Sequence, residues 1–108
     1  MQIPKLLAQA APPASTLTLL YRAPAGAKTN IHTVVLCNRV IAATTFRLAL
    51  APQGAADTAA HYLYYDYSLN GNSSHIATLD LTISEGDEVR VYTPSANVSC
   101  NLFGTESF

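Results

Sequence analysis

The sequence predicts an all-β chain: a single antiparallel β-sandwich, Ig-like or jelly-roll-like, with about seven strands and an extended N-terminal arm. Three observations lead to this prediction. Apolar and polar residues alternate with period two along most of the chain, as in strands that are buried on one face. Gly, Pro and Asn recur between the alternating segments, where turns need them. No segment shows a convincing helical period, although residues 55–60 could form one helical turn.

Composition limits the possible functions. The 108 residues allow one domain, and only 12% of them are charged while 49% are hydrophobic. The usual charged fraction is about 25%, so this composition argues against disorder and leaves little charge to cover the surface of a monomer. The formal net charge of −1 offers no basic footprint for nucleic acid, and no apolar run approaches the ~20 residues that span a bilayer. We therefore expect neither a nucleic-acid partner nor a membrane partner.

The first 16 residues differ from the rest of the chain. They are mostly small, and Pro12 and Pro13 exclude a helix or a central strand. We expect an extended arm at residues 1–16 and a β-sandwich domain at residues 17–108. The large apolar residues Ile3, Leu6 and Leu7 make the arm a candidate docking segment. Its apolar stretch is too short for a signal peptide, so we expect no secretion.

The first three expected strands cover residues 17–22, 31–38 and 45–51. The first alternates Leu and Tyr with Thr and Arg, and a Pro-Ala-Gly turn follows it. The second is rich in β-branched residues. The third places Phe46 and Leu48 on one face and Arg47 on the other.

The last four expected strands cover residues 61–69, 74–84, 88–93 and 98–103. Asn70-Gly71 lies between the first two of these and predicts a β-hairpin, because Asn-Gly suits a type I′ turn. The charged residues around Gly86 predict a solvated turn in which this glycine has a positive φ.

The strand at residues 61–69 is unusually rich in tyrosine. Strict alternation would send Tyr62 and Tyr64 to one face and Tyr65 and Tyr67 to the other. A strand with tyrosine on both faces needs cover on both faces, and tyrosine is enriched at protein interfaces. We expect these four tyrosines to form a subunit interface. Ordinary core and edge packing and a ligand platform are the alternatives.

No residue pattern predicts catalysis. His32, His61 and His75 lack the spacing of a zinc site, and the glycines form no phosphate-binding loop. Cys37 and Cys100 lie in apolar runs, which predicts small buried side chains, with a disulfide as the alternative. We expect a non-enzymatic protein with no catalytic residues, no cofactor and no metal.

A set of short segments occurs in order along the chain: Leu-Leu-Tyr-Arg-Ala-Pro-Ala-Gly at 19–26, Val-Val-Leu-Cys-Asn at 34–38, Thr-Phe-Arg-Leu-Ala at 45–49, Tyr-Asp at 65–66, Glu-Gly-Asp-Glu-Val-Arg-Val-Tyr at 85–92, Asn-Val-Ser at 97–99 and Phe-Gly-Thr-Glu at 103–106. As an ordered set, these segments resemble small virion structural proteins of tailed bacteriophages. The resemblance spans roughly residues 17–106 and implies a β-sandwich building block of the particle. It carries over no catalytic or binding residue.

These observations lead to one expected function and two alternatives. We expect a structural virion component, in the tail, neck, baseplate or capsid decoration, that forms a homo-oligomer, binds other virion proteins and assembles in the bacterial host cytoplasm. The first alternative is a carbohydrate- or receptor-binding module that uses the tyrosine strand or the loop at residues 54–60. The second alternative is an accessory or inhibitor domain of an enzyme.

Overall fold

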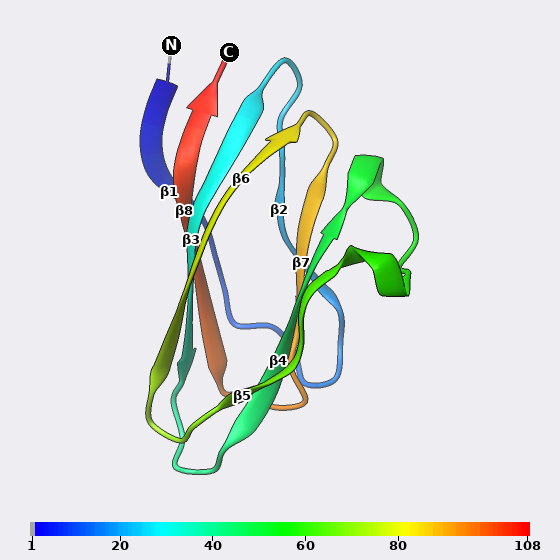
Figure 1. Cartoon of the computed structure of the whole chain (residues 1–108). Helices are drawn as coiled ribbons and strands as arrows, with labels where there is room; N and C mark the ends of the chain where they lie inside the picture. The colour runs from blue at the N-terminus through cyan, green and yellow to red at the C-terminus, as the bar shows by residue number, and fades with distance from the viewer. Residues whose placement is uncertain (1) are drawn as a thin grey trace.

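The computed structural model describes the backbone of residues 2–108 and the side chains of residues 5–108. Eight strands form two four-stranded antiparallel sheets that pack face to face (Figure 1), which confirms the predicted β-sandwich. Sheet A has the order β1 (Gln2–Ala10), β8 (Val98–Ser107), β3 (Lys28–Asn38) and β6 (Ser74–Ser84); sheet B has the order β2 (Thr18–Arg22), β7 (Glu88–Tyr92), β4 (Thr44–Ala51) and β5 (Tyr62–Leu69). Two short 3-10 turns, Pro52–Gly54 and Ala59–His61, lie between β4 and β5.

The strand order decides between the two expected sandwich types. Strands pair in a nested series, β1 with β8, β2 with β7, β3 with β6 and β4 with β5. The pairs β3–β8 and β4–β7 then complete the two sheets. This is the arrangement of a long antiparallel ribbon rolled up on itself, which defines the jelly roll.

The extended arm expected at residues 1–16 would lie outside the sandwich domain. This is wrong for residues 2–10, which form β1, the edge strand of sheet A beside β8. Leu7, Ala8 and Ala10 pack against the core, so the segment gains apolar burial as well as backbone hydrogen bonds. The small residues of β1 gave no clear period-two pattern. The structure of β1 is therefore determined by its pairing with the long strand β8, and not by the intrinsic β-propensity of its own residues.

The core lies between the inner faces of the two sheets. Its largest fully buried side chains come from both sheets: Phe46, Leu48 and Val91 from sheet B, and Ile31, Val34, Leu36, Val98 and Leu102 from sheet A. The predicted inward face of residues 45–51 is confirmed at Phe46 and Leu48, because both side chains are completely buried.

A polar cluster joins the sheets near the end where both termini lie (Figure 1). The Tyr21 hydroxyl on β2 donates to Glu106 on β8 at 2.6 Å and lies 2.9 Å from the Thr29 hydroxyl on β3. Lys5 on β1 forms an ion pair with the same carboxylate. Hydrogen bonding from Lys5 and then from Tyr21 lowers the pKa of Glu106, while burial together with the Glu106 contact raises the pKa of Tyr21 to about 12.

A second buried polar contact lies where β5 leads into β6. Asn38 is almost fully buried and donates to the carbonyl oxygens of Ala42, Leu69 and Asn70. The predicted Asn-Gly hairpin at this point is wrong, because β5 and β6 belong to different sheets. The loop needs Gly71 for space: a Cβ there would lie 1.8 Å from the Ile41 carbonyl oxygen. The residue with positive φ is Asn72, at 50°.

All four edge strands, β1, β2, β5 and β6, are irregular in the same way. In each pairing between an edge strand and its inner neighbour, the edge strand carries extra residues: one on β1 (Leu7), one on β2 (Leu20), one on β6 and two on β5. On β5 and β6 the irregularity includes an aspartate in the left-handed region, Asp66 at φ 50° and Asp80 at φ 54°. Such bulges twist an edge and disfavour the addition of a further strand.

Both cysteines are free thiols. Cys100 is buried as predicted, whereas Cys37 is only half-buried. Burial raises the pKa of the Cys100 thiol to about 12, so its thiolate is scarce at neutral pH.

We predict that a thiol reagent modifies Cys37 first and modifies Cys100 only after unfolding. Mass spectrometry after timed alkylation, with and without denaturant, measures this order. Labelling of native Cys100 as fast as Cys37 would contradict the structure.

Replacing Glu106 tests the cluster that joins the sheets. Because the pKa of Glu106 is lowered in the folded state, the stability that it contributes is present above its unfolded pKa of about 4.3 and is lost as pH falls through the folded value. We expect Glu106→Gln to lower the free energy of unfolding by about 1–3 kcal/mol at neutral pH. Denaturant titrations at several pH values measure the difference from wild type, which should shrink in acid. An equal loss at every pH would show that the charge has no role.

Candidate functional site

The tyrosines of β5 divide between the two faces of sheet B, but not as expected. Tyr62 contacts Tyr65, with ring centroids 5.0 Å apart, and Tyr64 contacts Tyr67 at 5.2 Å. The predicted grouping of Tyr62 with Tyr64 and of Tyr65 with Tyr67 is therefore wrong. The extra residues of β5 opposite β4, with Asp66 in the left-handed region, break the alternation on which the prediction depended.

Tyr64 and Tyr67 lie on the inner side, at the flank where β5 and β6 come together. Phe46 lies 5.4 Å from Tyr64 and 5.5 Å from Tyr67, and the His75 ring on β6 lies 4.7 Å from Tyr67. These aromatic rings partly close the gap between the sheets. Tyr67 nevertheless remains 44% exposed, so the flank is not fully covered by its own chain.

Tyr62 and Tyr65 lie on the outer face of sheet B with Arg47. The guanidinium of Arg47 lies over the Tyr65 ring at 4.1 Å and over the Tyr92 ring at 4.7 Å, both within the range of cation–π attraction. Arg47 also donates to both carboxylate oxygens of Asp66, at 2.6 and 3.2 Å. This contact lowers the pKa of Asp66.

The connection between β4 and β5 borders a hollow on this outer face. The hollow has a volume of about 610 Å³ and is lined by Arg47, Asp57, Thr58, Ala59, Tyr62 and Tyr65. The Tyr62 hydroxyl donates to Asp57 at 2.9 Å, and burial followed by this contact raises the pKa of Tyr62. Aromatic rings, a carboxylate, a guanidinium and a hydroxyl thus surround one space, which suits non-covalent binding of a small polar molecule.

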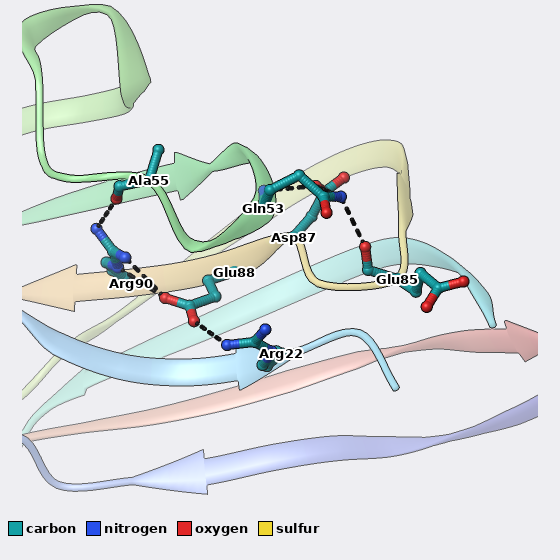
Figure 2. Close-up of polar contacts among 7 residues, drawn as sticks. All are labelled: Arg22, Gln53, Ala55, Glu85, Asp87, Glu88 and Arg90. Carbon is teal, nitrogen blue, oxygen red and sulfur yellow. Dashed lines mark hydrogen bonds and ion pairs between the residues drawn. The ribbon is translucent and has the colours of Figure 1, made fainter. Parts of the chain in front are cut away.

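Hydrogen bonds fix the start of this connection (Figure 2). The Gln53 backbone N–H donates to Asp87 at 3.0 Å, and the Gln53 side chain donates to the Glu85 carbonyl at 2.8 Å. Asp87 also accepts from the Ser84 backbone at 3.0 Å. Burial acts to raise the pKa of Asp87, but these hydrogen bonds outweigh it and lower the pKa. Gly86 has a φ of +85°, as predicted for this turn.

Glu88 holds the same connection from β7 (Figure 2). It accepts from Arg90 at 2.7 Å and from Arg22 at 3.0 Å, and Arg90 donates in turn to the Ala55 carbonyl at 2.8 Å. The interpretation of this charged segment as a solvated turn is wrong for Glu88, which is buried between the two arginines. Glu88 stands two residues before Arg90 in the sequence, which is compatible with their contact. No sequence pattern indicated that Gly54 lies against the Glu88 carboxylate.

The candidate docking residues lie far from the tyrosines in the strand order. Leu6 is exposed beside an outer hollow of sheet A, of about 490 Å³, that Phe103 also lines. Leu7 points to the core, and the side chain of Ile3 lies outside the described residues. Because β1 and β5 occupy opposite ends of their sheets' strand orders, the structure does not bring the two sets together.

Two further observations concern the part of the chain that the structure describes. In residues 2–108, no helix is both long and apolar enough to cross a bilayer. No three His, Cys, Asp or Glu side chains among the described ones lie close enough together to bind a metal ion.

Arg47 and Asp57 were not recognised as site residues from the sequence. The one available sign for Arg47 was its place on the outward face of the strand at residues 45–51. Asp57 is brought to Tyr62 by a connection without regular alternation, which sequence patterns do not describe.

Replacing Asp87 tests whether this turn fixes the β4–β5 connection. We expect Asp87→Asn to speed amide hydrogen exchange in residues 53–60 and to cost about 1–3 kcal/mol of stability, because backbone donors lose a charged acceptor. Glu85→Gln is the matched control, since Gln53 contacts only the Glu85 backbone. Equal exchange in both variants would contradict the role of Asp87.

Comparisons of the chain with protein-family models, curated proteins and solved structures find no match.

Proposed function

We propose that the chain is a structural subunit of a tailed-phage virion that acts without catalysis, by binding copies of itself and other virion proteins. The resemblance over residues 17–106 supports this proposal, and the jelly roll is an architecture that capsid proteins use. The proposed location is the virion, after assembly in the cytoplasm of the bacterial host.

The observation that favours self-association most is a set of exposed apolar side chains on the neighbouring edge strands β5 and β6. Tyr67 lies at the inner flank, whereas Ile76 lies opposite Val35 on the outer face of sheet A. Leu63 is 43% exposed, Tyr67 44% and Ile76 63%. The His75–Tyr67 contact shows that the two strands lie side by side. Since only 12% of the residues are charged, few charged side chains are available to surround these apolar groups.

Subunits should meet through side chains and not by joining strands. The extra residues on β5 and β6 interrupt the regular backbone edge that strand addition would need. Of the four tyrosines proposed for the interface, Tyr67 is the best placed, because it is exposed at this flank. The exposed Leu6 on β1 is the proposed contact for a different virion protein.

We expect the purified chain to be a homo-oligomer, and we expect Ile76→Glu to weaken its self-association about tenfold or more. The variant places a charge where an apolar side chain is buried between subunits. Light scattering and sedimentation over a concentration series measure the change. Leu19→Glu is the matched control, because Leu19 is half exposed on β2, at the opposite edge of sheet B from β5.

A monomeric wild type, or equal behaviour of the two variants, would contradict this interface. The virion role has its own test: quantitative mass spectrometry of purified particles of the phage that encodes the chain. We expect its peptides in stoichiometric amounts, and their absence would refute the proposal.

A further inference from the structure

The outer hollow of sheet B is built from groups whose positions are fixed by other contacts. Tyr65 is 60% exposed, yet Arg47 lies against its ring and Tyr62 meets it edge to face at 88°. Asp66 holds Arg47 with two hydrogen bonds. A site whose rings are already oriented loses little conformational entropy when a ligand binds.

The rim of the hollow is fixed as well. Arg90 holds the Ala55 carbonyl, and the Gln53–Asp87 contact holds the start of the same connection. Asp57 is attached to Tyr62 through one carboxylate oxygen, Oδ2. A carboxylate has about four acceptor positions, so Asp57 retains capacity to accept hydrogen bonds from a ligand.

The charges around the hollow select the ligand class. An anion would meet Asp57 on the rim, and Arg47 is already neutralised by Asp66. A cation would meet the Arg47 guanidinium, which occupies one face of the Tyr65 ring. A neutral molecule with many hydroxyl groups meets neither penalty and can donate to Asp57.

We propose that this hollow binds a neutral saccharide. The C–H face of a sugar ring packs against the exposed part of Tyr65, and sugar hydroxyls bind Asp57 and the Thr58 hydroxyl. The volume of about 610 Å³ lies in the range of small-molecule sites. The proposal goes beyond self-association and does not rest on the virion role, because the hollow belongs to a single chain.

The test uses the full chain labelled with ¹⁵N and titrated with glucose, galactose, mannose, N-acetylglucosamine, lactose and maltose. We expect at least one sugar to shift the amide signals of residues 57–65. Tyr65→Ala and Asp57→Asn should each weaken that binding about tenfold or more, whereas Tyr65→Phe, which keeps the ring, should largely preserve it. Tyr67→Ala is the matched control, since it removes a tyrosine from the other face of β5.

Three outcomes would overturn the saccharide site. None of the sugars shifts these signals; or Tyr67→Ala weakens binding as much as Tyr65→Ala; or inorganic phosphate or tetramethylammonium shifts the same signals more strongly than any sugar. Circular dichroism of each variant distinguishes a loss of binding from a loss of folding. If Tyr65→Ala does not fold, the result for Asp57→Asn decides whether the saccharide site is correct. Sedimentation of Ile76→Glu is a separate experiment, so failure of either proposal leaves the other intact.

Discussion

The antiparallel pairing of the first strand with the last is the constraint on which the rest of the structure depends. Because β1 covers the edge of β8, β8 becomes an inner strand and can bury Val98, Cys100 and Leu102 completely. The same pairing brings Lys5 to Glu106, which in turn holds Tyr21 on the opposite sheet. The N-terminal residues are therefore part of the sandwich, and any docking role of Leu6 must be performed from a paired strand.

The bulged edges and the fixed outer face divide the surface into regions with different uses. Edges that carry an extra residue are poor templates for strand addition, so association is left to side chains. The β5–β6 flank offers apolar side chains, whereas the outer face of sheet B offers rings held by Arg47 and a carboxylate held by Tyr62. One irregular strand, β5, serves both regions. Its extra residues send Tyr62 and Tyr64 to opposite faces, and likewise Tyr65 and Tyr67.

The sequence predicted the elements whose burial follows a simple period. In the expected strand at residues 45–51 the inward residues Phe46 and Leu48 alternate with Thr45 and Arg47, and the structure buries both. The sequence did not predict features that depend on contacts between residues far apart in the chain. The strand β1 has few large side chains, and it forms because it pairs with β8. Asn70-Gly71 suits a tight hairpin locally, but contacts with Asn38 and Ile41 place it in a connection between the two sheets. The hollow was missed for the same reason, because its residues come together only after β4, β5 and their connection are in place.

The nested strand order has a consequence for how the chain reaches this structure. Among the strands of residues 2–108, β4 and β5 are the only sheet neighbours that are consecutive in sequence. Contacts between distant segments slow folding, because a long loop must close before they form. The β4–β5 ribbon can form early, but sheet A cannot be completed until β8 has left the ribosome and returned to β1. The outer face of sheet A is thus finished only after β8 has paired with both β1 and β3.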